Sequence, residues 1–81
     1  MREAKALFVN ENSKAIEAIK TINKTEAYIA LVVDKEHKLL GTITDGDIRR
    51  GLLKGYTTES NIKKFMNRSM DNLYINDLLI Y

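Results

Sequence analysis

The alternation of apolar and polar positions divides the chain into a series of short elements. A first apolar pair, Phe8-Val9, is followed by polar residues 10–13, which suit the end of a short strand and the capping of a helix. From residue 14 to about residue 23 the apolar side chains recur every three or four positions. They are Ala15, Ile16, Ile19 and Ile22. This spacing predicts an amphipathic helix with one buried stripe.

The middle of the chain predicts a hairpin and a second helix. Residues 28–33 are a continuous β-branched and aromatic run, which is typical of a buried strand. Residues 34–38 are a polar reversal, and residues 39–44 then resume strand character, so the two runs predict an antiparallel hairpin. Residues 45–53 return to helical spacing. Gly55 is placed to end that helix in the left-handed conformation.

The predicted fold is an α/β (α+β) domain of order β-α-β-β-α, with a three-stranded sheet and two helices on one face. We place it in residues 1–68 and include a short helix from Ile62 to Met66. Residues 69–81 are a C-terminal extension or the start of a truncated second repeat, because Tyr74-Ile75-Asn76-Asp77 matches Phe8-Val9-Asn10-Glu11 in residue type. Since the helices cover one face only, we expect the other face or an edge to meet a neighbour.

Composition and charge narrow the class of protein. The 81 residues are 44% hydrophobic with both charge signs mixed, which describes one small globular domain. The lack of cysteine excludes a disulfide framework, thiolate metal ligands and a cysteine nucleophile, and it fits a cytoplasmic protein. We expect no signal peptide and no membrane segment, since no stretch approaches the roughly 20 apolar residues that span a bilayer. A domain this small buries only about 60–65% of its surface, so we expect a partner chain or a ligand to stabilise it.

The segment best suited to chemistry is residues 41–50, where a predicted strand runs directly into a helix. Free backbone N–H groups and the positive end of the helix dipole attract phosphate there. Thr44 can donate its hydroxyl to a phosphate oxygen, Asp47 can accept from the hydroxyls of a ribose, and Gly46 leaves room for a ligand. The same Thr-x-x-Asp spacing is also a capping box, in which Thr44 caps the helix while Asp45 and Asp47 favour its dipole. Spacing alone leaves both interpretations open.

This segment resembles the end of a CBS domain. The string Gly41-Thr42-Ile43-Thr44-Asp45-Gly46-Asp47 is similar to the Gly-x-apolar-Thr/Ser-x-x-Asp motif of that family. The order of elements over residues 8–55 resembles the family as well. The longer string from Thr44 to Arg50 is similar to the CBS modules attached to sugar-phosphate isomerases and sugar nucleotidyltransferases.

The resemblance implies a regulatory module, without catalytic residues, that binds an adenine nucleotide or a related adenosyl ligand such as AMP, ADP, ATP or S-adenosylmethionine. Thr44 would contact a phosphate and Asp47 would hold the ribose, with Asp45 and Gly46 between them in the same ligand site. The adenine ring would lie against side chains of the first two strands, for which core burial is the rival interpretation. These side chains are Val9, Tyr28, Ile29 and Ala30.

The single copy has its own implication, because CBS domains usually occur as two tandem copies. Either two chains supply the pair as a homodimer, or the chain is a fragment of a longer protein. In both cases the resemblance implies that the module controls a fused or partner enzyme acting on sugar phosphates or sugar nucleotides.

Two other functions remain open. The predicted helix over residues 45–53, followed by a polar turn and Ile62–Met66 with its two lysines, resembles a helix-turn-helix unit that binds nucleic acid. The net charge of only +2 argues against nucleic acid as a partner. A ligand-free dimerisation module is the other alternative, in which Thr44 and Asp47 serve only as a cap.

Few other residues offer chemistry. Arg49 and Arg50 are candidates for contact with a phosphate or a partner's carboxylate. His37 is the only histidine, and a solvated hairpin loop is expected there rather than a metal site. Ser13 and Ser60 have no histidine partner, so no nucleophile is predicted.

Overall fold

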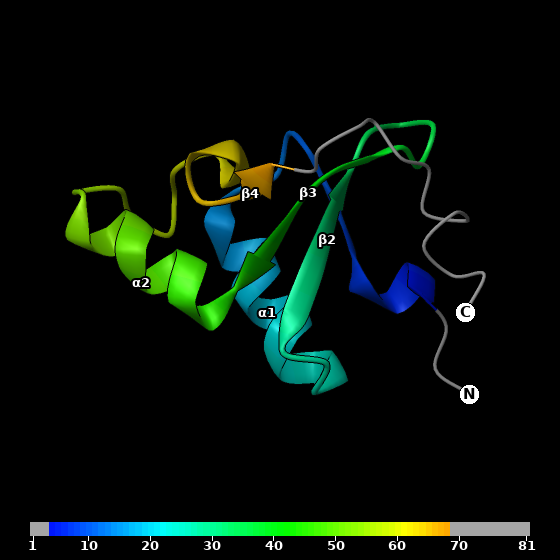
Figure 1. The fold of residues 1–81 in the computed structure, drawn as a ribbon, viewed down its shortest axis with the longest axis horizontal. Coiled ribbons are helices and arrows are strands. Elements are labelled where there is room, and N and C mark those ends of the chain that lie inside the picture. Colours follow the sequence, from blue (N-terminus) through cyan, green and yellow to red (C-terminus); the bar gives the residue numbers. More distant parts are fainter. Residues whose placement is uncertain (1–3, 69–81) are drawn as a thin grey trace.

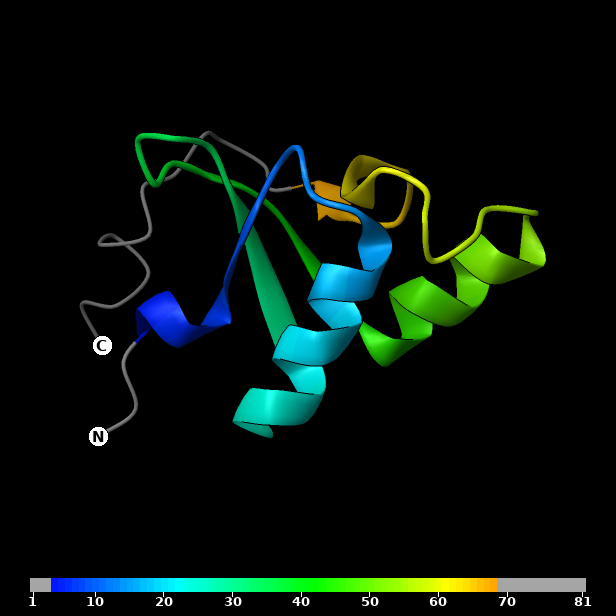
Figure 2. The same cartoon turned by 180° about the vertical axis from the view of Figure 1, so that it is seen from behind.

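The computed structural model describes residues 4–68 as one sheet with helices packed against it (Figures 1 and 2). The strands are β1 (Phe8–Asn10), β2 (Ile29–Val33), β3 (Leu39–Thr44) and β4 (Asn67–Arg68). The helices are α1 (Ala15–Thr25) and α2 (Asp45–Leu53). A 3-10 turn, η1 (Ala4–Leu7), precedes β1, and a second, η2 (Ile62–Lys64), lies between α2 and β4. The predicted order β-α-β-β-α is confirmed. The predicted extension, with its repeat at residues 74–77, lies outside the described residues.

The sheet has the order β1-β2-β3-β4, so each strand pairs with its neighbours in sequence. β1 is parallel to β2, because α1 carries the chain back across one face of the sheet. β2 and β3 form the predicted antiparallel hairpin. The prediction of three strands is one too few, since Asn67 and Arg68 add β4 along the far edge of β3. A two-residue strand has no alternating pattern, so hydrophobic periodicity could not reveal it.

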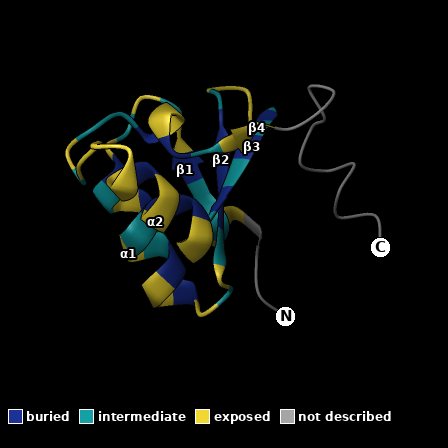
Figure 3. Ribbon diagram, turned by 60° about the vertical axis from the view of Figure 1, so that its left-hand side comes forward, coloured by how far each residue is buried: buried dark blue, intermediate teal, exposed yellow. Residues whose placement is uncertain are grey.

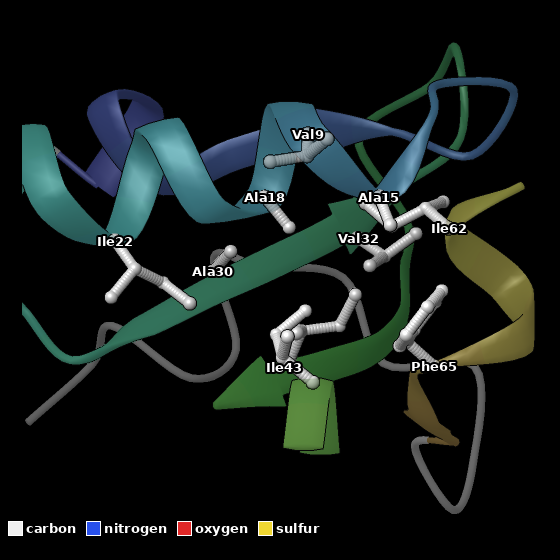
Figure 4. Close-up of a cluster of buried hydrophobic side chains, with 10 residues drawn as sticks. Val9, Ala15, Ala18, Ile22, Ala30, Val32, Ile43, Ile62 and Phe65 are labelled. Carbon is white, nitrogen blue, oxygen red and sulfur yellow. The ribbon is translucent and has the colours of Figure 1, made fainter. Parts of the chain in front are cut away.

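Both helices pack on the same face of the sheet, as predicted, and enclose the main core (Figures 3 and 4). The core takes side chains from both helices, from the three longer strands and from the segment that follows α2. They are Val9, Ala15, Ala18, Ile22, Ala30, Val32, Ile43, Ile48, Ile62 and Phe65. The buried stripe of α1 therefore confirms the amphipathic pattern, although Ile16 and Ile19 are only partly buried.

The opposite face of the sheet is apolar as well. Leu31, Val33 and Leu39 are buried there. Leu7 of η1 packs against them, together with Phe8 and Ile29. β2 thus has apolar neighbours on both faces, which accounts for its continuous apolar sequence.

α1 begins at Ala15, and a distant loop satisfies its first N–H groups. The N-cap residue, Lys14, makes no side-chain cap bond, so the predicted capping by residues 10–13 is wrong. The backbone N–H of Ala15 donates to the carbonyl of Ser60 at 2.8 Å, and that of Ile16 donates to the carbonyl of Thr58 at 2.9 Å. The helix start therefore depends on a contact with the segment after α2, which local sequence does not show.

The segment from residue 62 to residue 68 is a 3-10 turn and a short strand, not the predicted helix from Ile62 to Met66. Two glycines allow it to pack closely. A Cβ at Gly51 of α2 would overlap the ring of Phe65, and a Cβ at Gly41 of β3 would lie 2.6 Å from the carbonyl oxygen of Asn67. These close approaches hold the segment against α2 and β3.

Candidate functional site

The junction between β3 and α2 is built as a complete capping box. Thr44 is the N-cap residue, with extended backbone (φ −119°, ψ 174°), and its hydroxyl accepts from the N–H of Asp47 at 3.4 Å. In return, Oδ2 of Asp47 accepts from the N–H of Thr44 at 2.9 Å. The capping interpretation of the Thr-x-x-Asp spacing is therefore confirmed.

Asp47 is a buried carboxylate whose oxygens are both engaged. The residue is only 7% exposed. Its Oδ2 also accepts from the Thr44 hydroxyl at 3.1 Å, while Oδ1 accepts from Nη2 of Arg50. These bonds compensate the burial of a charge, which would otherwise be costly. The Arg50 side chain is 65% exposed, so Oδ1 is held by a group that can swing into solvent.

The other residues predicted at the junction are exposed. Asp45 and Gly46 open the first turn of α2 with free access to solvent. A Cβ at Gly46 would make ordinary contacts, 3.5 Å from Nη1 of Arg50 and 3.7 Å from Oγ1 of Thr44. The fold alone therefore does not require glycine at this position. Arg49 is exposed too.

The four residues predicted to contact an adenine ring divide between three environments. Val9 and Ala30 are 5% and 0% exposed within the helix-side core, so their burial favours the core role that rivalled ligand contact. Ile29 lies on the opposite face and pairs directly with Thr44 across the hairpin. Tyr28 lies just before β2 with a left-handed backbone (φ 66°), and it is 74% exposed rather than buried in the strand as predicted. The structure thus places Ile29 beside the junction, and Tyr28 is the exposed residue that precedes Ile29 in the sequence.

A pocket of about 270 Å³ lies beside Asp47, between α2 and the segment that leads into β4. We call it the α2–β4 pocket. Its lining residues are Asp47, Arg50, Gly51, Lys54, Lys64, Phe65, Met66 and Asn67. The spacing of Asp47, Arg50 and Lys54 along α2 could have indicated one wall from the sequence. The other wall could not be predicted, because the sequence predicts a helix from Ile62 to Met66 where the structure has a 3-10 turn followed by a short strand.

The remaining candidate residues have structural partners. The ring of His37 meets the ring of Phe8 edge-on, with centroids 5.0 Å apart. Within residues 4–68, no three His, Cys, Asp or Glu side chains are grouped so as to hold a metal ion. None of the helices in that range has the length and apolar character to cross a bilayer.

The sequence and the fold are both similar to CBS proteins. The sequence profile of the CBS domain matches residues 1–54. An uncharacterised protein of Helicobacter pylori (strain J99) is 47% identical over 36 residues, which are 44% of this chain and 11% of that protein. The curated relatives are much longer, since the matched residues span between 11% and 14% of their length.

Solved structures share the fold at low identity. A CBS domain protein from Pyrobaculum aerophilum, complexed with AMP, has a TM-score of 0.70 at 11% identity and covers 98% of this chain and 68% of that chain. The CBS domain pair of protein MJ0100, in complex with 5-methylthioadenosine and S-adenosyl-L-methionine, has a TM-score of 0.67 at 24% identity, covering 91% and 63%. The profile match over most of the chain and the shared sheet and helix order lead to one conclusion: this chain belongs to the CBS domain family.

Proposed function

We propose that this chain is a regulatory CBS module that binds an adenosine-containing ligand at the β3–α2 junction. The observation that carries the proposal is Asp47, a buried carboxylate at a strand-to-helix junction whose Oδ1 is held only by the exposed Arg50 side chain. The bound AMP and S-adenosyl-L-methionine of the two solved CBS proteins support the ligand class. CBS domains generally regulate other proteins rather than catalyse, and we propose the same role here.

Binding in this scheme is an exchange of partners on Asp47. A ribose hydroxyl donates to Oδ1 and displaces Arg50, while Oδ2 keeps its bonds from Thr44 and so preserves the start of α2. The displaced guanidinium gains a phosphate as its new partner, because arginine binds phosphate as readily as carboxylate. Ile29 and Tyr28 offer apolar contact to the base.

Pairing completes the proposal. The two solved CBS proteins extend well beyond the region that this chain covers, and one of them is a CBS domain pair. Exposed apolar side chains at the end of α2 and just after it, Leu52, Leu53 and Tyr56, suit contact with a second unit. We propose that two chains pair as a homodimer and that occupancy changes how the two units pack, through different ligand affinities of the two states. We propose that the regulated partner is an enzyme that acts on sugar phosphates or sugar nucleotides, because the string from Thr44 to Arg50 resembles CBS modules attached to such enzymes.

Calorimetric titration with AMP, ADP, ATP and S-adenosylmethionine tests the proposal. We expect at least one ligand to bind the wild type and Asp47→Asn to weaken it strongly, because the amide loses the charge that accepts from ribose hydroxyls. Glu36→Gln is the matched control, since Glu36 is exposed in the hairpin loop and the substitution makes the same change of charge away from the junction. Circular dichroism establishes that each variant is folded at the titration temperature.

The outcome separates two functions. If no adenosine ligand binds the folded wild type while light scattering shows a dimer, the chain is a ligand-free dimerisation module. The complete capping box favours that second candidate, because it gives Thr44 and Asp47 a role without any ligand. The structure argues against the helix-turn-helix alternative, because Ile62–Lys64 is a single 3-10 turn where that alternative needs a recognition helix.

A further inference from the structure

The α2–β4 pocket has an unbalanced set of charges. Its lining residues include one acid, Asp47, and three bases, Arg50, Lys54 and Lys64. Asp47 and Arg50 form an ion pair with each other. The ion pairs of the described part of the chain use Lys14, Lys20 and Lys63 but neither of the pocket lysines. The pocket lining therefore includes two lysines, Lys54 and Lys64, that form no ion pair with a carboxylate within residues 4–68.

The fold places these two ammonium groups on opposite walls. Lys54 is the C-cap residue of α2, and Lys64 ends the η2 turn, so the packing of η2 against α2 sets their approach. The Lys64 ammonium lies 5.8 Å from the centre of the Tyr56 ring, close enough for a cation–π contact. Asn67 and Arg50 line the same pocket and can supply further N–H donors, since Arg50 uses only Nη2 on Asp47.

We infer that the α2–β4 pocket binds a small phosphate-bearing anion. Several N–H donors around two uncompensated cations match the acceptor oxygens of phosphate, whereas the carboxylate of Asp47 is already neutralised by Arg50 and turned to Thr44. The volume of about 270 Å³ is below the roughly 300–1,000 Å³ of sites for drug-sized ligands, so it suits a phosphate group rather than a whole nucleotide.

This inference does not depend on adenosine binding. The phosphate has two possible sources, a free anion such as pyrophosphate or the phosphate end of a nucleotide held at the junction. Both place the same chemical group among the same cations. The pocket can be tested with a probe that has no base and no ribose, so the two proposals can fail separately.

The test is an NMR titration of the labelled chain with pyrophosphate. We expect saturable amide shifts that concentrate at residues 50–54 and 64–67, and a loss of affinity of roughly ten-fold or more in Lys54→Gln/Lys64→Gln, because bonds between charged groups are the strong ones. Lys24→Gln/Lys35→Gln is the matched control. Both lysines are exposed, one in α1 and one in the hairpin loop, and this double substitution removes the same charge as the pocket variant. Thermal unfolding checks that all variants are folded, which matters because Lys64 also faces Tyr56.

Two results overturn the inference. The first is the absence of saturable amide shifts in the wild type. The second is an equal loss of affinity in the pocket variant and the control, because this means that pyrophosphate is attracted to the cationic surface in general. A second arm compares ATP with adenosine. Weaker ATP binding by the pocket variant, with adenosine unchanged, identifies the anion as the end of a nucleotide. Pyrophosphate binding that the pocket variant loses, with ATP binding unaffected, supports a free anion.

Discussion

Replacement of glycine by alanine should have opposite effects on stability at two positions of α2, Gly51 and Gly46. Gly51 is buried, and a Cβ there would overlap Cδ1 and Cε1 of Phe65 and lie 3.1 Å from its Cγ. Phe65 is 5% exposed and meets Tyr56 ring to ring, so it has little freedom to move aside. Gly46 is exposed, and its added Cβ would make only ordinary contacts.

The magnitudes follow from packing and helix propensity. Overpacking a core costs about 1–3 kcal/mol, and a severe overlap belongs at the upper end. Alanine recovers about 0.5–1 kcal/mol over glycine in a helix. Gly51→Ala should therefore lower the free energy of unfolding by about 2 kcal/mol, or Tm by about 8–16 °C for a domain of this size. Gly46→Ala should raise Tm by about 2–4 °C, using the lower propensity value near the helix end.

Urea and thermal unfolding of the two variants check this prediction. Phe65→Leu in the Gly51→Ala background should recover part of the loss, because a smaller side chain relieves the overlap. The coupling energy of that double-mutant cycle measures the contact directly. If Gly51→Ala is as stable as Gly46→Ala, the η2 segment does not pack on α2, and the α2–β4 pocket is not formed as described.

Two further predictions concern the hairpin and the cap. Thr44→Ala should cost about 1 kcal/mol of unfolding free energy while Thr44→Ser keeps most of it, because only the hydroxyl caps α2; equal urea midpoints for the two variants would contradict this. The backbone N–H groups of Lys38 and Glu36 bond the Asp34 carboxylate and hold its pKa below the ordinary value of 3.8. A lowered folded pKa means that this stabilisation is present above pH 3.8 and is lost as the pH falls through the folded pKa. Urea unfolding should therefore give Asp34→Asn a lower free energy of unfolding than the wild type at pH 7, and this difference should narrow towards pH 3. A difference in unfolding free energy that does not change with pH refutes the role of the carboxylate.

Much of the fold was predictable because its information is local. The stripe of α1, the two runs of the hairpin and the Thr44–Asp47 box all depend on residues within a few positions of one another. Gly55 likewise takes the left-handed backbone (φ 102°) that its position after α2 predicts. The misplaced elements depend on distant partners: α1 starts on carbonyls of Thr58 and Ser60, and β4 exists only because β3 offers an edge.

The candidate site likewise combines features that depend on local sequence with features that depend on distant parts of the chain. The sequence by itself determined which residues stand at the start of α2 and that Thr44 and Asp47 can cap it, since a helix repeats every few residues and fixes those neighbours. Only the tertiary structure decided that Asp47 is buried with Arg50 as its exchangeable partner, and that Tyr28 is exposed while Val9 and Ala30 lie in the core. It alone also brought Lys64 opposite Lys54. Burial and the approach of distant segments follow from how the elements pack, which no local spacing records.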